Sequence, residues 1–294
     1  MPLNLRKTCV DIDCVMEVKE RKAPERTDLH LLIISLAEPR PFTRRDGTGG
    51  EMVSGLVGDT TGTARLICWE PALLSGISPG MAVSVTGALT KEGDYGGREI
   101  VCDEETSIAP ADTIPDILVT ALDNIVPDQS FTVRGTITKI LPAKPFTKRD
   151  GTTSFVRNLR FSDGTADVPL VLWDADAKRT LLPGETVMLY NAYAKVGRSG
   201  EVEVSLGRGG ALTVIPDKEE PVRIEGWVLH VPEGVVITNQ EGSWLVETRL
   251  PHGSHVIMTG RASGKRVFCE SEEGVKEDLE GLKNEVSSFI RSFS

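Results

Sequence analysis

An internal repeat restricts the fold of this chain more than any other feature of its sequence. Residues 41–47 read Pro-Phe-Thr-Arg-Arg-Asp-Gly, and residues 145–151, which lie 104 positions later, read Pro-Phe-Thr-Lys-Arg-Asp-Gly. The same offset pairs Trp69 with Trp173 without a gap. A match held over this length indicates a duplicated folding unit of about 100 residues, which is large enough to bury a core of its own.

Composition and chain ends predict a cytoplasmic protein. The 294 residues allow two or three small domains, and no apolar run approaches the ~20 residues of a membrane-spanning helix. Residues 1–17 carry acidic side chains where a signal peptide needs an apolar core, and the five cysteines are odd in number and scattered. These features favour reduced thiols and no association with a membrane.

The net charge of −10 is distributed unevenly. Residues 103–128 hold seven acidic and no basic residues, and residues 270–294 hold seven acidic and three basic ones, which leaves +1 for the rest. Because local potential rather than net charge attracts a polyanion, the acidic balance weakens a nucleic-acid interpretation without excluding it.

Each repeat predicts five short strands, with a brief helix or turn between the third and the fourth. The third strands are Arg65–Trp69 and Pro169–Trp173, and each is followed by a Pro-Gly turn and a further strand. This order is typical of an OB-fold barrel. We therefore expect an all-β protein with tandem OB-fold, five-stranded barrels at residues 15–110 and 119–215. The acidic, proline-containing segment Ala109–Pro115 between them is either a linker or an ordered connection.

The repeat register is lost after Pro216, although strand-like segments continue. They predict a third compact, OB-like β-barrel at residues 218–271. Apolar residues at spacings of four and three predict a C-terminal amphipathic α-helix at residues 272–294. The apolar stripe consists of Val275, Leu279, Leu282, Val286 and Phe289.

The repeated phrase, by which we mean the seven-residue sequence at 41–47 and 145–151, places basic side chains beside an aromatic ring. Such an arrangement can hold phosphates while a base stacks on the ring. The residues are Arg40, Phe42, Arg44 and Arg45 in the first unit and Lys144, Phe146, Lys148 and Arg149 in the second. Alternatively, the phenylalanines plug the ends of the barrels and the charges belong to a solvated loop.

Trp69 and Trp173 end the third strand of their units. Strand alternation separates Leu66 and Cys68, which suit the core, from Arg65, Ile67 and Trp69 on the opposite face. An outward-facing indole is a stacking platform worth about 1–3 kcal/mol per base. A core or barrel-edge position is the alternative.

The two units differ in other residues that we expect to line a nucleic-acid-binding groove on each barrel. Asn158 and Arg160 lie on a polar strand face of the second unit, where the first has Ser54 and Leu56, so weaker binding is expected in the first. The turn before the last strand adds further candidates, namely Tyr95 and Arg98 in the first unit and Lys195 and Arg198 in the second.

Residues for catalysis or metal binding are not grouped. Cys9 and Cys14 lack a second cysteine pair at zinc spacing, and no phosphate loop, nucleophile elbow or H-E-x-x-H motif occurs. The recurring Asp59 and Asp163 fit turn chemistry. We expect no enzymatic activity, no cofactor and no metal.

The segments Val57–Glu70 and Pro79–Val83, with their counterparts Phe161–Asp174 and Pro183–Val187, resemble the single-stranded-DNA-binding domains of replication protein A. The resemblance is to the archaeal replication factor A proteins with tandem OB-folds in particular. It covers about residues 15–215, but the zinc-binding cysteine cluster of many relatives is lacking.

The resemblance implies that Trp69 and Trp173 stack on bases and that the loops of the repeated phrase contact DNA. It also implies a second stacking aromatic near Tyr95, where the second unit has Ser199. In that family a C-terminal helix can join subunits; the alternative for 272–294 is packing on its own third barrel.

The expected function is therefore non-enzymatic binding of single-stranded DNA, which protects it in replication, recombination and repair. Two alternatives remain open at this point. One is an RNA-binding OB-fold protein, and the other is a protein-interaction scaffold that uses the barrels and the C-terminal helix.

Overall fold

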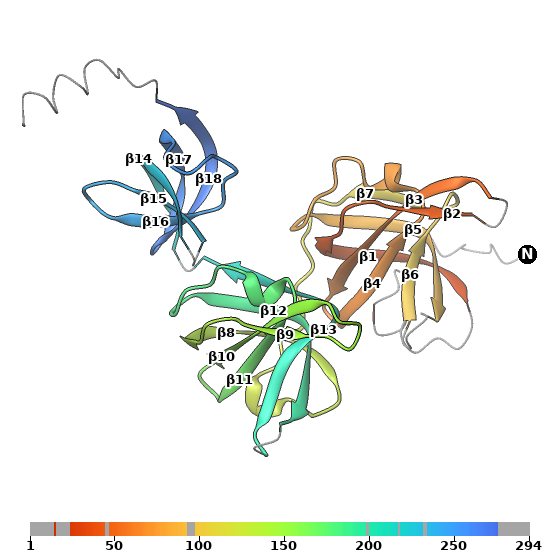
Figure 1. Cartoon of the computed structure of the whole chain (residues 1–294). Helices are drawn as coiled ribbons and strands as arrows, with labels where there is room; N and C mark the ends of the chain where they lie inside the picture. Colours follow the sequence, from red (N-terminus) through yellow and green to blue (C-terminus); the bar gives the residue numbers. More distant parts are fainter. Residues whose placement is uncertain are drawn as a thin grey trace, which may run out of the picture. The chain divides into compact units, whose positions relative to one another are not determined.

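The computed structural model describes residues 15, 24–44, 47–92, 98–197, 200–216, 218–231 and 234–275 (Figure 1). It divides into two compact units, Met1–Ile215 and Pro216–Ser294. The described elements are β-strands and three short 3-10 helices. No helix among the described residues is long and apolar enough to cross a membrane.

The first unit begins with a closed five-stranded barrel. Its strands are β1 (Glu25–Leu36), β3 (Gly49–Asp59), β4 (Gly62–Cys68), β5 (Ala82–Glu92) and β6 (Arg98–Cys102), with the 3-10 helix η1 (Pro71–Leu74) after β4. β1 pairs antiparallel with β3 and with β5, β3 pairs with β4, and β4 runs parallel to β6, which returns to β5. The barrel predicted from the strand pattern is therefore present.

A second closed barrel repeats this order. Its strands are β8 (Ser130–Ile140), β10 (Thr153–Ser162), β11 (Asp167–Trp173), β12 (Thr186–Val196) and β13 (Val202–Ile215). η2 (Leu122–Asn124) precedes the barrel, and η3 (Asp176–Lys178) follows β11. β11 and β13 form the parallel pair that corresponds to β4 and β6. The sequence repeat is thus a repeat of the whole barrel.

Alternation along the strands fills each barrel. Leu29, Leu31 and Ile33 face the first core from β1, and Leu170 and Leu172 face the second core from β11. These side chains are almost fully buried, and burying an aliphatic side chain contributes about 1.5–3 kcal/mol. Hydrophobic burial on one strand face therefore determines which side chains remain outside.

The repeated aspartates form part of the barrel frame, as expected for turn residues. Asp59 Oδ1 accepts hydrogen bonds from the Thr61 amide and hydroxyl, and Asp163 Oδ1 accepts the same pair from Thr165. The second oxygen of Asp163 accepts the amide of Leu122 at 2.7 Å. The second oxygen of Asp59 likewise accepts the amide of Val15 at 2.7 Å. Each carboxylate thus holds a hairpin turn and a residue that precedes its barrel.

The connection between the barrels is ordered. β7 (Ser107–Pro110) pairs antiparallel with β5, and Ile117 packs with Ile34, Leu56 and Tyr190 in a small apolar cluster. Of the two alternatives for the acidic segment, the structure has the ordered connection. Leu56, which corresponds to Arg160 of the second unit, is only 2% exposed. The strand face that we expected to line the groove of the first unit is therefore covered at this position.

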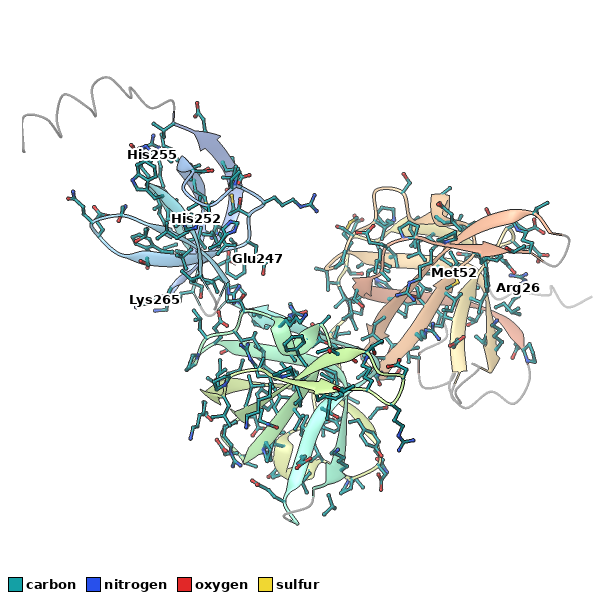
Figure 2. The ribbon with its side chains drawn as sticks, viewed as in Figure 1. Arg26, Met52, Glu247, His252, His255 and Lys265 are labelled. Carbon is teal, nitrogen blue, oxygen red and sulfur yellow. The ribbon has the colours of Figure 1, made fainter. Side chains whose placement is uncertain are left out.

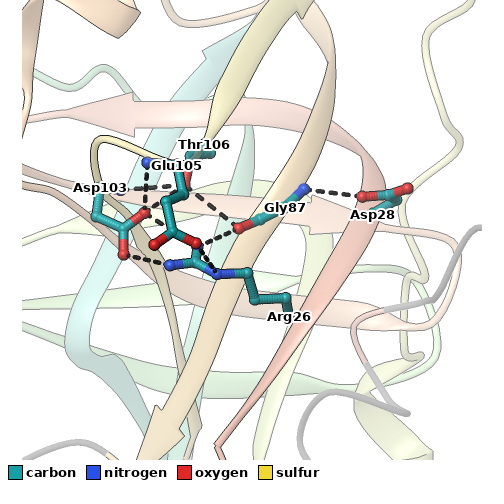
Figure 3. Close-up of polar contacts among 6 residues, drawn as sticks. All are labelled: Arg26, Asp28, Gly87, Asp103, Glu105 and Thr106. Carbon is teal, nitrogen blue, oxygen red and sulfur yellow. Dashed lines mark hydrogen bonds and ion pairs between the residues drawn. The ribbon is translucent and has the colours of Figure 1, made fainter.

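An ionic network joins β1 of the first barrel to the turn after β6 (Figure 3). The guanidinium of Arg26 in β1 pairs with Asp103 at 2.9 Å and with Glu105 at 3.0 Å. The hydrogen bond from Arg26 is the largest cause that lowers the pKa of Asp103. Asp28 accepts the amide of Gly87, whose φ of 72° suits the bulge there. The network fastens β1 to the turn after β6.

The second unit contains a smaller closed barrel. Its strands are β14 (Glu220–Val231), β15 (Gly234–Thr238), β16 (Ser243–Val246), β17 (His255–Ser263) and β18 (Arg266–Gly274). Glu272–Gly274, where we expected the C-terminal helix to begin, instead belong to β18, because their backbone pairs with Val256–Met258 of β17. The rest of that expected helix, residues 276–294, lies outside the described residues.

Candidate nucleic-acid interface

The repeated phrase forms an edge hairpin rather than a simple loop. β2 (Arg40–Thr43) pairs with the start of β3, and β9 (Lys144–Thr147) pairs with the start of β10. Phe42 lies opposite Gly50, where an added Cβ would lie 2.8 Å from the phenyl ring. The glycine therefore leaves the space that the ring occupies.

The hairpin aromatic meets the tryptophan in both barrels. The rings of Phe42 and Trp69 have centroids 4.7 Å apart and planes at 69°. The rings of Phe146 and Trp173 lie 5.5 Å apart at 86°. Both are edge-to-face arrangements, which aromatic pairs favour. The phenylalanines thus pack against the tryptophans, and contact of their rings with a base stays a prediction.

The tryptophans lie outside the cores, as strand alternation predicts. Leu66 and Cys68 are buried in the first core and Leu170 and Leu172 in the second, whereas Trp69 is half-buried and Trp173 is 44% exposed. The ammonium group of Lys91 lies 5.9 Å from the ring centroid of Trp69. The second barrel therefore offers the more accessible indole.

One basic residue of each hairpin pairs with the acid that directly follows the tryptophan. Arg44 lies 3.6 Å from the carboxylate of Glu70, and Lys148 lies 2.7 Å from that of Asp174. Hydrogen bonds from Lys148, and then from Ser154, lower the pKa of Asp174. We call these four-residue groups the repeated clusters: Phe42, Arg44, Trp69 and Glu70, and Phe146, Lys148, Trp173 and Asp174.

Other predicted cations fall into two groups. Arg40, Lys144 and Arg149 are exposed at the hairpins. Arg160 instead lies between Asp167 and Glu201, with Nη1 2.7 Å from the Glu201 carboxylate. The hydrogen bond to Glu201, with a further one to Asp167, raises the pKa of Arg160. Its charge is balanced within the barrel, which reduces the difference expected between the two grooves.

Two further candidates are also paired. Arg65 forms a 2.8 Å ion pair with Glu99, and Lys195 lies 3.8 Å from Glu203. Asn158 is exposed on β10. The predicted residues Arg45, Tyr95 and Arg198 lie outside the described residues, and only the backbone of Arg98 is described, as the first residue of β6.

The sequence prediction missed three contributors. Lys91 lies near the ring of Trp69. The carboxylates of Glu70 and Asp174 form ion pairs with the basic hairpin side chains Arg44 and Lys148. The repeat contained a signal for all three, because Lys91 recurs as Lys195 and an acid follows the tryptophan in both units. We had not predicted a binding role for any of them.

The closed barrels and the repeated clusters define a tandem OB-fold protein. Its sequence is similar to Replication factor A of Methanothermobacter thermautotrophicus (strain ATCC 29096 / DSM 1053 / JCM 10044 / NBRC 100330 / Delta H), with 25% identity over 213 residues. The match covers 66% of this chain and 26% of the relative, so the chain spans about a quarter of that protein's length. The resemblance inferred from the motifs is confirmed, while no family model matches the sequence.

Solved structures with similar chains include a replication protein A heterotrimer bound to ssDNA. It is 10% identical with a TM-score of 0.46, over 92% of this chain and 97% of that one. Another is the second OB-fold domain of replication protein A from Methanococcus maripaludis. It is 23% identical with a TM-score of 0.31, over 35% of this chain and all of that one.

Proposed function

We propose that the protein binds single-stranded DNA with its first two barrels and protects it during replication, recombination and repair. The observation that carries this proposal is the repeated cluster, in which an outward tryptophan stands beside hairpin cations in both barrels. Similarity to Replication factor A supports it. No described group of His, Cys, Asp or Glu could hold a metal ion, and we assign no reaction to the chain.

Binding combines stacking with phosphate contacts. A base stacks on the exposed indole of Trp173, while Arg149 and Lys144 on the neighbouring hairpin attract the backbone phosphates. Lys148 exchanges its contact with Asp174 for a phosphate. Stacking depends on the π-face, which every base has, so we expect binding with little sequence preference.

The two barrels act together because they belong to one compact unit joined by an ordered connection. Once a strand is bound at one barrel, its next nucleotides reach the other in an intramolecular step, which raises the overall affinity. Trp173 is the more exposed tryptophan, so we expect the second barrel to bind more tightly.

A titration with oligo-dT of increasing length, followed by tryptophan fluorescence, tests the proposal. We expect quenching, and an affinity whose logarithm falls linearly with the logarithm of salt concentration by about 0.7 per phosphate contact. The absence of quenching at low salt, or an affinity independent of salt, would contradict it. Competition with oligo-U of matched length distinguishes DNA from RNA, and tighter binding of oligo-U would favour the RNA alternative.

A further inference from the structure

The third barrel has a different binding chemistry from the other two. It lacks the repeated phrase, and its described residues contain no Phe–Trp pair; its ring contacts are Trp227–His255 and His230–His252. Trp227 lies in the middle of β14, the first strand of this barrel, whereas Trp69 directly follows β4, the third strand of its own. The exposed indole here therefore belongs to a separate site.

Trp227 borders an open cleft of about 600 Å³. Its other lining residues include Glu225, Asn239, Glu241 and His255, the last of which is labelled in Figure 2. The indole stacks on the imidazole of His255, with centroids 4.6 Å apart and planes at 10°. Trp227 is still 38% exposed, so the cleft contains an aromatic surface held in place by its neighbour.

The cleft has two carboxylates, Glu225 and Glu241, among its polar lining residues, which also include Thr238, Asn239, Gln240 and His255. Glu225 precedes Trp227 by two positions and so shares its strand face; its Oε1 lies 3.6 Å from Nε2 of His255. The amide of Asn239 is already used, because Nδ2 donates to the Glu225 carbonyl and Oδ1 accepts the Glu241 amide. A ligand therefore meets an indole and two carboxylates, Glu225 and Glu241, with Gln240 and His255 beside them.

Charge separates this cleft from the repeated clusters. The described residues that line it include neither lysine nor arginine. Residues 218–275 hold nine acidic and six basic residues, a net of −3, whereas residues 119–215 hold ten acidic and twelve basic ones, a net of +2. A phosphate is thus repelled here, while a cation is attracted.

We propose that this cleft binds an arginine side chain from a basic segment of a partner protein. The planar guanidinium stacks on an indole face, and its fork of N–H donors matches a carboxylate in two parallel hydrogen bonds. Lysine has a compact, strongly hydrated charge and matches both features less well. The third barrel is then a protein-binding module, with a role separate from that proposed for the first two barrels.

NMR of the indole N–H groups in the full-length chain tests this proposal. The resonance of Trp227 is assigned with the Trp227→Phe variant, and the probe is acetyl-Gly-Arg-Gly-Arg-Gly-amide. We expect a saturable shift of the Trp227 resonance, at least 3-fold weaker binding of the matched lysine peptide, and at least 5-fold weaker binding of the arginine peptide to Glu225→Gln.

Glu220→Gln is the matched control, because it removes the same charge from the same strand outside the cleft. It should change the affinity for the peptide less than 2-fold. Equal losses in the two variants would show general attraction to an acidic surface and would overturn the proposal. A saturable shift of the Trp227 resonance on addition of oligo-dT, with weaker oligo-dT binding by Trp227→Phe, would assign the cleft to a base and overturn the proposal as well.

Discussion

The ring of Phe42 stands edge-on to the indole of Trp69, with centroids 4.7 Å apart. The two residues are 27 positions apart in the sequence, and the pairing of β2 with β3 and of β3 with β4 brings them together. Phe146 and Trp173 repeat the contact in the second barrel. The phenylalanine of the repeated phrase thus packs against the tryptophan that we propose to bind DNA.

Replacing Trp173 by alanine should weaken oligo-dT binding by about 1–3 kcal/mol, because one stacked base loses its platform. Trp69→Ala should cost less, since Trp69 is less exposed than Trp173 and already has Lys91 beside it. Fluorescence anisotropy with labelled oligo-dT measures both. Trp244→Phe in the third barrel is the control, and a loss there equal to that of Trp173→Ala would contradict the assignment.

Asp174→Asn should strengthen oligo-dT binding by about 2- to 5-fold at low salt, because it frees Lys148 for a phosphate. Asparagine tolerates the left-handed backbone at this position, where φ is 53°. Glu220→Gln removes an equal charge from the third barrel and should have little effect. If both variants strengthen binding equally, net charge rather than the Lys148 pair is responsible.

Arg149→Ala should reduce the slope of log affinity against log salt by about 0.7, the value of one phosphate contact on a single strand. Arg160→Ala should change the slope less, because Asp167 and Glu201 already balance that guanidinium. Salt titrations of the two variants provide the comparison. A larger change for Arg160→Ala would show that DNA displaces both carboxylates.

Asp163→Ala should lower the free energy of unfolding of the first unit by about 1–3 kcal/mol, because the partly buried amides of Leu122 and Ala166 lose a charged acceptor. The lost acceptor served Leu122, Thr165 and Ala166. Urea unfolding followed by circular dichroism measures the change. Asp150→Ala is the matched control, since that exposed turn aspartate accepts hydrogen bonds only from Thr152 among the described residues.

The same carboxylate predicts a pH dependence. Burial acts to raise the pKa of Asp163, but hydrogen bonds from Leu122, Thr165 and Ala166 outweigh it, so the pKa is lowered. Its stabilisation is therefore complete above the unfolded value near ~3.9 and is lost as pH falls through the folded pKa. Wild type should lose stability below about pH 4 more steeply than Asp163→Ala; parallel curves would contradict this.

Much of the barrel architecture could be predicted from local pattern. Alternation assigned Leu66 and Cys68 to the core and Trp69 to the opposite face, because a strand has only two faces. It did not predict that Ile67, on the face of Trp69, is also buried. The local sequence pattern gave wrong expectations where contacts with other segments of the chain determine a residue's structure. Glu272–Gly274 continue β18 because β17 supplies backbone partners, and Leu56 is covered by a cluster that contains Tyr190, 134 positions later.

The amino-acid sequence by itself determined the duplication, the strand faces and the outward position of both tryptophans, since these follow from local periodicity and from one pattern read twice. Only the tertiary structure decided which cations are available, because ion pairs join residues that chain folding brings together. Glu201 reaches Arg160 across 41 positions, and Asp174 reaches Lys148 across the edge hairpin. Tertiary contacts likewise placed His255 of β17 beside Trp227 of β14, since neighbouring strands juxtapose side chains that no local pattern relates.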